Sequence, residues 1–188
     1  MSRWEPNGRG RLEQAALELY VERGYEQTTV AEIAKRAGLT ERTFFRHFAD
    51  KREVLFGGAE ALQELLVSRL AEAPASAAPI DAVAAALDPL GAHFHELREH
   101  ARLRQSVIAA NTELQERELI KLASLAAALA GALRGRGVGE PAASLAAEAG
   151  VAVFRVAFET WIGGNGERDL SEIARESLAE LRSVTAGA

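Results

Sequence analysis

The densest signal in this chain is a run of helix starts and stops within residues 28–56. In 29 residues, TTVAEIAKRAGLTERTFFRHFADKREVLF contains three helix starts and two helix stops, with Gly38 near the middle. This spacing allows only short helices joined by tight turns. Two short helices around a glycine-centred turn are the plan of a helix-turn-helix, a unit that inserts its second helix into the major groove of DNA.

The first of these helices has a clear start and a clear end. Thr29 and Glu32 form a capping box, which predicts a helix beginning at Val30. Gly38 follows it, and glycine adopts without steric cost the left-handed conformation that commonly ends a helix. Apolar residues recur at helical spacing along one side, which is therefore expected to be buried: Val30, Ile33, Ala34 and Ala37.

The second helix is expected over residues 41–48, with Thr40 placed as its N-cap. Phe44 and Phe48 are four residues apart, so both are expected to face the core. The other side carries polar and charged side chains of the kinds that reach base edges and phosphates. These are Glu41, Arg42, Thr43, Arg46 and His47.

A third acidic capping pattern, formed by Asp50 and Glu53, predicts a longer helix over residues 51–72. Gly57 and Gly58 lie inside it, and each lowers helix propensity by about 1 kcal/mol relative to alanine. The two glycines are expected to mark either a bend or a place where neighbouring helices approach closely.

The stretch over residues 28–56 resembles the N-terminal signature of the TetR family of bacterial transcriptional regulators. The resemblance lies in the paired threonines, an Ile-Ala pair, Ala-Gly, an aromatic pair, His-Phe and the lysine that opens the next helix. It extends back over residues 8–27, so it covers roughly the first third of the chain. It implies an all-α protein of about nine helices, with an N-terminal three-helix helix-turn-helix DNA-binding domain at residues 1–50. A larger helical effector-binding and dimerisation domain is then expected at residues 51–188.

The resemblance implies that the helix over residues 41–48 is the recognition helix. Thr28 and Thr29 are expected near phosphates at the start of the preceding helix, and Lys51 near a phosphate from the next one. For Arg46 and Lys51 an ordinary solvated role is the alternative, and for His47 a packing role. The expected DNA-binding residues are Thr28, Thr29, Thr40, Glu41, Arg42, Thr43, Phe45, Arg46, His47 and Lys51.

Two residues of the recognition helix depart from the family pattern. Phe45 stands where the family often has a tyrosine whose hydroxyl reaches a phosphate. Phenylalanine cannot donate that hydrogen bond, but it can contact a thymine methyl group or a sugar. Arg42 replaces a position often held by glycine or proline, and so adds a long cation at the groove.

The rest of the chain is expected to remain helical. The sequence is 48% hydrophobic, has five prolines and shows no alternating strand pattern of useful length. After a linker over residues 73–79, a helix is expected from residue 80 to about residue 99, interrupted near Pro89. Further helices are expected over residues 112–134, 141–162 and 170–184, separated by glycine-rich loops.

The last two of these helices are expected to form a homodimer interface. Residues 145–162 are apolar on nearly every side, and a helix that is apolar all round must be covered all round. Leu170, Ile173, Ala174, Leu178 and Leu181 supply a matching stripe on the final helix. The family resemblance implies a four-helix bundle between two copies. Two recognition helices about 34 Å apart would then read a palindromic operator on double-stranded DNA.

The middle helices are expected to enclose a small-molecule site, although plain core packing is the competing interpretation. The C-terminal half, with LRGRGVGEP and later Phe-Glu-Thr-Trp-Ile, resembles actinobacterial TetR-like regulators with an acyl-CoA-like ligand-binding domain. This implies an elongated apolar effector, with Arg98, Arg102 or Arg104 available for an anionic head. The expected lining consists of Phe94, Leu97, Arg98, Leu103, Val107, Val153, Phe154, Phe158 and Trp161.

One cluster of histidines and glutamates allows an alternative. On a helix His93 and His95 point about 200° apart, so they do not readily share a metal, whereas Glu96 and His100 are four residues apart and can. We expect a solvated or ligand-polarising face and no metal site. The chain has no cysteine, phosphate loop, nucleophile elbow or HExxH motif, so we expect neither a catalytic site nor a cofactor.

The net charge of −5 is distributed unevenly. Residues 1–56 contain ten Lys and Arg against nine Asp and Glu, and the remaining residues contain twelve against eighteen. A local basic surface on an acidic body suits sequence-specific DNA binding. No signal peptide and no run of about 18 uncharged apolar residues is present, so a cytoplasmic protein without a membrane span is expected.

Together these features predict a dimeric, all-helical, ligand-responsive transcriptional regulator, interpreted as a repressor. Two alternatives remain open. One is an activator or a regulator without an effector, which a tightly filled core would favour. The other is a helical enzyme that uses His93, His95 and His100, which would need a polar cavity around them. The N-terminal head with Arg3 and Trp4 is interpreted as disordered rather than as an arm along the DNA backbone.

Overall fold

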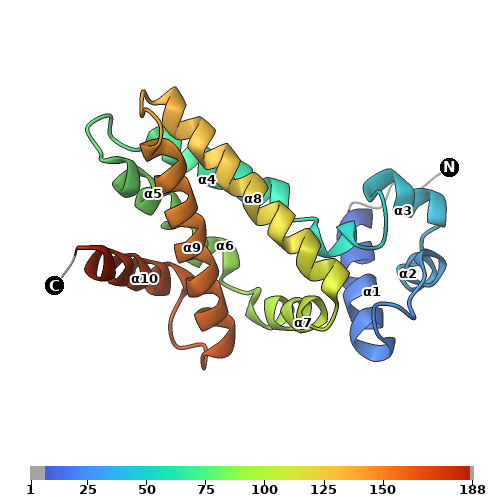
Figure 1. Cartoon of the computed structure of the whole chain (residues 1–188). Helices are drawn as coiled ribbons and strands as arrows, with labels where there is room; N and C mark the ends of the chain where they lie inside the picture. Colours follow the sequence, from blue (N-terminus) through green and yellow to red (C-terminus); the bar gives the residue numbers. More distant parts are fainter. Residues whose placement is uncertain (1–6, 187–188) are drawn as a thin grey trace. The chain divides into compact units, whose positions relative to one another are not determined.

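The computed structural model describes residues 7–186, so Arg3 and Trp4 lie outside the described residues. Within this range every regular element is a helix, which confirms the all-α class (Figure 1). The first unit contains α1 (Gly8–Arg23), α2 (Val30–Arg36), α3 (Glu41–His47) and the 3₁₀ helix η1 (Glu53–Phe56). There follow α4 (Ala59–Glu72), α5 (Pro79–Leu87), α6 (Leu90–Phe94), α7 (Arg98–Ala109), α8 (Thr112–Gly135), α9 (Ala142–Gly163) and α10 (Leu170–Thr185).

The chain divides into two compact units. The N-terminal unit consists of Met1–Ala59 together with Leu103–Glu118, and the second unit consists of Glu60–Arg102 together with Leu119–Ala188. This division differs from the boundary expected at residue 50, because the first unit extends to residue 59 and takes in parts of α7 and α8. The roles assigned to residues 1–50 and 51–188 remain predictions.

The core of the N-terminal unit joins residues that are far apart in the sequence. Leu12, Ile33 and Phe44 have no exposed side-chain surface and bring α1, α2 and α3 together. Ile108 and Leu114 are equally inaccessible and belong to the same cluster. Burying a side chain of this size contributes about 1.5–3 kcal/mol, so the ends of α7 and α8 are part of this core.

The helix-turn-helix forms as the capping residues predicted. The hydroxyl of Thr29 accepts the backbone N–H of Glu32 at 3.3 Å, and the Glu32 carboxylate accepts the N–H of Thr29 at 2.9 Å. The hydroxyl of Thr40 accepts the N–H of Thr43 at 3.2 Å at the start of α3. Between the two helices Gly38 has a φ of 68°, a left-handed conformation that explains the glycine.

The single helix predicted over residues 51–72 is wrong. The Asp50 carboxylate does accept the N–H groups of Arg52 and Glu53, at 2.8 and 3.2 Å, but the segment that follows is only the short 3₁₀ helix η1. α4 begins separately at Ala59. Val54, Leu55 and Phe56 are all buried in the core of the N-terminal unit, so packing holds this short segment. The low helix propensity of Gly57 and Gly58 then allows the break.

In the second unit, α9 packs against α5 and α10, and Figure 1 shows these three helices next to one another. A Cβ atom at Gly150 of α9 would lie 2.3 Å from Cγ1 of Val83, so glycine is required for the close approach of α5. The helix predicted to continue to about residue 99 is also wrong, because α6 ends at Phe94 and α7 begins at Arg98. Within residues 7–186 no helix combines the length and apolar character needed to cross a membrane.

Candidate nucleic-acid interface

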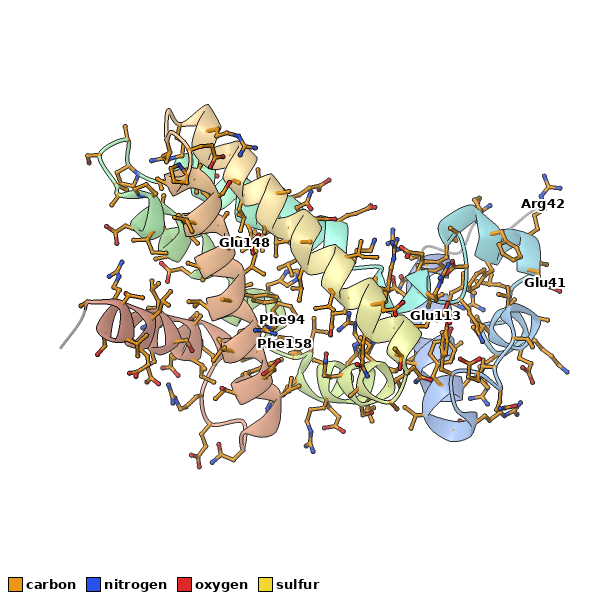
Figure 2. The ribbon with its side chains drawn as sticks, in the orientation of Figure 1. Glu41, Arg42, Phe94, Glu113, Glu148 and Phe158 are labelled. Carbon is orange, nitrogen blue, oxygen red and sulfur yellow. The ribbon has the colours of Figure 1, made fainter. Side chains whose placement is uncertain are left out.

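The outward side of α3 carries an unusual mixture of side chains for a solvent-exposed helix. Thr40, Glu41, Arg42, Phe45 and Arg46 are exposed, and Figure 2 shows Glu41 and Arg42 pointing away from the unit. Thr43 and His47 are half-buried beside them. The structure therefore brings all seven predicted residues of α3 and its N-cap onto one short helix.

Two aromatic residues fix this orientation from beneath. Phe44 is fully buried and Phe48 is 4% exposed, and their ring centroids are 5.6 Å apart. Because these two positions are four residues apart, their side of α3 must face the core of the N-terminal unit. Packing of these two rings therefore holds the opposite side of α3 toward solvent.

The cations near α3 differ in whether a carboxylate already neutralises them. Arg42 forms no ion pair with any residue that the structure describes, and Arg46 approaches only the ring of His47, at 3.5 Å. By contrast, Arg36 on α2 is paired with Glu22 at 2.8 Å and Glu18 at 3.3 Å. Arg42 and Arg46 are therefore the cations that a phosphate or a guanine edge would meet without competition.

The predicted role of Thr28 requires correction. Its side chain is 1% exposed, and its hydroxyl donates to the carbonyl of Gly24 at 2.9 Å. A buried hydroxyl that is already donating cannot reach a phosphate, so Thr28 secures the turn between α1 and α2. Thr29 is exposed at the N-terminus of α2, where helix N–H groups favour an anion.

Lys51 is also placed differently from the prediction. Its ammonium group donates to the carbonyls of Tyr25 at 3.0 Å, Thr28 at 3.3 Å and Glu26 at 3.4 Å. It also lies 4.3 Å from the ring centroid of Tyr25. A lysine ammonium has three donors, and here all three face the turn between α1 and α2. This geometry makes Lys51 a residue that holds the start of α2 in place.

One supporting residue was missed by sequence reasoning. The guanidinium of Arg11 on α1 donates to the carbonyl of Ala37, directly before the turn at Gly38. This contact ties the centre of the helix-turn-helix to α1. No local pattern reveals it, because the two residues are 26 positions apart.

In the second unit, four of the predicted ligand-binding residues form an aromatic cluster. Phe94 lies 5.7 Å from Phe158 and 5.8 Å from Trp161, and Phe158 lies 5.8 Å from Phe154, all measured between ring centroids. Figure 2 shows Phe94 and Phe158 side by side. The neighbouring Val153 is 3% exposed.

Arg98 lies against this cluster. Its Nε donates to the carbonyl of Trp161 at 2.9 Å. Its Nη2 atom is buried and has no hydrogen-bond partner among residues 7–186. By contrast, Arg102 is 55% exposed with Glu99 3.8 Å away, so of the arginines considered for an anionic head only Arg98 adjoins the aromatic cluster.

Three predicted ligand residues lie elsewhere. Leu97 is 43% exposed, and Leu103 and Val107 belong to the N-terminal unit, where Val107 packs into the core. An open groove of about 510 Å³ lies between α5 and α10, lined by Asp81, Asp88, Arg175, Arg182 and alanine and leucine side chains. None of the predicted ligand residues lines this groove. Among the described residues no three His, Asp or Glu side chains gather as metal ligands.

The expected dimer face also needs one correction. Leu145 and Val156 on α9 are 66% and 48% exposed, so one side of this apolar helix is uncovered in the single chain. The stripe on α10, however, is already buried within its own unit: Leu170, Ile173, Ala174 and Leu178 are at most 7% exposed. The outer side of α10 is charged instead, with Glu172, Arg175, Glu176, Glu180 and Arg182.

Comparison with known proteins matches this architecture. Residues 13–56 match the family model described as bacterial regulatory proteins of the tetR family. Residues 77–186, more than half of the chain, match the model described as the MftR C-terminal domain. The chain belongs to the TetR family of bacterial regulators. The resemblance seen in the sequence is therefore confirmed.

Individual relatives match either a part of the sequence or the fold of the whole chain. The HTH-type transcriptional regulator TcmR of Streptomyces glaucescens is 42% identical over 78 residues, which cover 42% of this chain and 34% of TcmR. The match thus spans about a third of that relative. A putative TetR-family regulator of Syntrophomonas wolfei has the same fold, with a TM-score of 0.66 and 16% identity over 96% of this chain and 95% of the other.

A third comparison concerns a protein solved with its ligand. FadR of Thermus thermophilus, described as a TetR-family transcriptional repressor in complex with lauroyl-CoA, aligns with a TM-score of 0.50 and 23% identity. The alignment covers 92% of each chain. At this identity the comparison establishes the shared fold and nothing about the ligand of the present protein.

Proposed function

We propose that this TetR-family member is a cytoplasmic repressor that leaves a palindromic operator when a small, largely apolar ligand binds its second unit. The observation that carries the DNA-binding part is the two-sided character of α3. Phe44 and Phe48 are buried, whereas Arg42, Phe45 and Arg46 face solvent. A helix built in this way can enter a major groove without disturbing the core that supports it.

The residues of α3 are proposed to make different kinds of contact with DNA. Arg42 and Arg46 contact guanine edges or phosphates, and Glu41 accepts from a cytosine amino group. Phe45 makes apolar contact with a thymine methyl group or a sugar. The exposed Thr29 and Thr40 and the half-buried Thr43 and His47 complete the surface that faces DNA.

A homodimer through the last two helices would place two copies of α3 on one duplex. The exposed Leu145 and Val156 on α9 support this, because a second copy would cover them. The charged outer side of α10 would contribute a polar border to the interface rather than an apolar centre. Two-fold symmetry of the protein then requires two-fold symmetry of the operator.

The aromatic cluster is proposed as the effector site, with Arg98 binding an anionic head. Support comes from the buried, unpartnered Nη2 of Arg98 next to Phe94, Phe158 and Trp161. The relative solved with lauroyl-CoA makes an acyl-CoA a reasonable first probe. Ligand entry would have to displace the rings, because none of them lines the open groove between α5 and α10. Binding would favour a dimer whose recognition helices no longer match the operator spacing.

The closed packing of this cluster also favours a second candidate, a regulator without a small-molecule effector. Fluorescence anisotropy on DNA from upstream of the protein's own gene, with and without lauroyl-CoA, separates the two. Salt-dependent binding that lauroyl-CoA releases is the expected result. Arg98→Met should weaken the release, whereas Arg102→Met, which changes an exposed arginine, should not. Binding that ignores every acyl-CoA would support the second candidate and contradict the effector proposal.

A further inference from the structure

Two helices of this protein belong to both units at once. α7 (Arg98–Ala109) begins in the second unit and passes into the N-terminal unit at Leu103. α8 (Thr112–Gly135) starts in the N-terminal unit and leaves it after Glu118. The hairpin formed by Leu103–Glu118 is therefore covalently continuous with the second unit through two helices.

Arg104 holds this hairpin to η1. Its Nε donates to the carbonyl of Leu55 at 2.6 Å, and its guanidinium lies 5.0 Å from the ring centroid of Phe56. Its Nη1 donates to Oε1 of Glu118 at 3.3 Å, and the amide of Gln105 donates to Oε2 of the same carboxylate at 3.2 Å. The side chains of Arg104 and Glu118 are only 21% and 25% exposed, so their hydrogen bonds are partly shielded from water.

Burial lowers the pKa of the Arg104 guanidinium, and the carboxylate of Glu118 opposes that change. An arginine remains charged in proteins even so. Separating a partly buried charge from its partners would destabilise the folded state. The hydrogen bonds of Arg104 therefore fix the position of η1 more strictly than apolar packing alone.

Two further ion pairs flank this contact. Arg52, just before η1, lies 3.0 Å from Glu113 at the start of α8, where Figure 2 labels Glu113. Glu53 in η1 lies 2.5 Å from Arg117. Each end of η1 is thus fixed to the hairpin. The direct connection from η1 to α4 is instead non-helical at Gly57 and Gly58.

From η1 the contacts continue to the helix-turn-helix. The hydroxyl of Tyr20 donates to the carbonyl of Lys51 at 2.6 Å. The ammonium group of Lys51 donates to the carbonyls of Tyr25 and Thr28, directly before α2. Arg104 is therefore connected to the start of α2 by hydrogen bonds at Leu55 and Lys51, and by the backbone of residues 51–55 between them.

We propose that the Leu103–Glu118 hairpin is the coupling element of this regulator, and that Arg104 is the positioning residue through which the state of the second unit reaches α2 and α3. The regulatory role of this hairpin rests on the proposed function. The mechanical connection between the hairpin and the helix-turn-helix does not require an effector. Strain introduced in the second unit should alter the helix-turn-helix only while Arg104 holds η1. If the hairpin couples the units, substitutions at Arg104 and in the second unit should have non-additive effects on the helix-turn-helix.

The first test is amide hydrogen exchange of the full chain, read by mass spectrometry. Arg104→Met keeps an unbranched apolar stem and removes every donor. Exchange in residues 50–58 and 28–48 should become at least about tenfold faster, because a charged donor is lost from a buried carbonyl. The control is Arg102→Met, two positions earlier on the same helix. Arg104→Lys, which keeps the charge, serves as the second variant if Arg104→Met does not fold. Unchanged exchange in residues 50–58 would overturn the proposal.

The second test introduces strain in the second unit. Gly150→Ala would place a Cβ atom 2.3 Å from Val83, whereas Gly131→Ala on α8 would meet only the end of Arg134 at 3.8 Å. Gly150→Ala should speed exchange in residues 28–58 in the parent chain and add little in the Arg104→Met chain. If Gly150→Ala affects residues 28–58 no more than Gly131→Ala does, the hairpin does not couple the units. Failure of DNA binding would appear separately in the anisotropy experiment and leave this result intact.

Discussion

Phe44 and Phe45 are adjacent residues with opposite environments. Phe44 is fully buried, Phe45 is 56% exposed, and their rings meet edge to face with centroids 5.4 Å apart. The buried ring supports the exposed one, so an apolar surface is held rigidly on the outward side of α3. Single exposed aromatic residues need no special explanation, but one fixed among arginines on a short helix suits contact with DNA.

This relationship predicts that substituting the two phenylalanines affects different properties, stability for Phe44 and operator binding for Phe45. Phe44→Ala should lower the free energy of unfolding by about 3–5 kcal/mol, because it leaves a cavity in the core. Phe45→Ala should change it by less than about 0.5 kcal/mol and weaken operator binding instead. Denaturant unfolding and anisotropy distinguish the two. A stable Phe45→Ala chain with full operator affinity would remove Phe45 from the interface.

Phe45→Tyr is predicted to strengthen operator binding. The substitution adds a hydroxyl at an exposed position, where it can donate to a phosphate without disturbing Phe44. A gain of about 0.5–1.5 kcal/mol in binding free energy is expected from one such hydrogen bond. Titration of the operator at fixed salt measures it, and weaker binding by Phe45→Tyr would indicate that the ring lies against an apolar base edge.

Arg42 and Arg46 should differ from other surface arginines in the salt dependence of binding. Replacing either by alanine should weaken operator affinity, and a replaced phosphate contact should reduce the slope of log K against log salt by about 1. Arg69→Ala on α4 is the control, since Arg69 is exposed and paired with Glu72 at 3.0 Å. Equal slopes for all three variants would contradict the assignment of these two arginines.

Lys51 should behave as a supporting residue. Lys51→Met should weaken operator binding without reducing the salt slope, because the ammonium group donates to backbone carbonyls instead of a phosphate. Hydrogen exchange at residues 25–31 should accelerate in the same variant. A reduced salt slope with unchanged exchange would return Lys51 to the phosphate contacts implied by family resemblance.

The N-terminal unit should lose stability in acid through Asp50. The Arg52 guanidinium beside it, together with the N–H groups of Glu53 and Arg52, lowers the pKa of the Asp50 carboxyl. A lowered pKa in the folded state means that the stabilisation is present above the unfolded value, about 3.9, and is lost as pH falls through the folded value.

Asp50→Asn tests this directly. It should cost about 1 kcal/mol at pH 7, the size of a capping interaction, and the difference from the parent chain should shrink below about pH 4. Urea unfolding at several pH values measures it. A difference that stays constant down to pH 3 would show that Asp50 is not responsible for the acid sensitivity.

The parts of this structure that the sequence predicts are those determined by near neighbours in the chain. Thr29, Glu32, Gly38 and Thr40 specify the helix-turn-helix through contacts within a few residues, and each behaves as expected. The aromatic cluster around Phe158 follows from helical spacing in the same way. Interactions between near neighbours in the sequence were therefore sufficient to predict which side of α3 faces outward.

The features that sequence reasoning missed depend on distant partners. The short η1 packs into a core that includes residues of α1 and of the ends of α7 and α8, and these partners are distant in the sequence. Thr28 and Lys51 have the residue types that approach phosphates, yet their hydrogen bonds are directed to carbonyls of the turn before α2. The apolar stripe of α10 predicts only that this side of the helix is covered, because nothing local indicates whether its own unit or a second copy covers it.

Two copies of α3 are proposed to read a two-fold symmetric DNA site. Selection of binding sequences from a randomised duplex library, followed by sequencing of the bound fraction, tests it most directly. The expected result is an enriched palindrome whose half-site centres are separated by one helical turn, about 10–10.5 base pairs, or a multiple of it. Arg42→Ala or Arg46→Ala should relax the preference at particular positions of each half-site. Enrichment of a single asymmetric half-site, or of no sequence at all, would contradict the account.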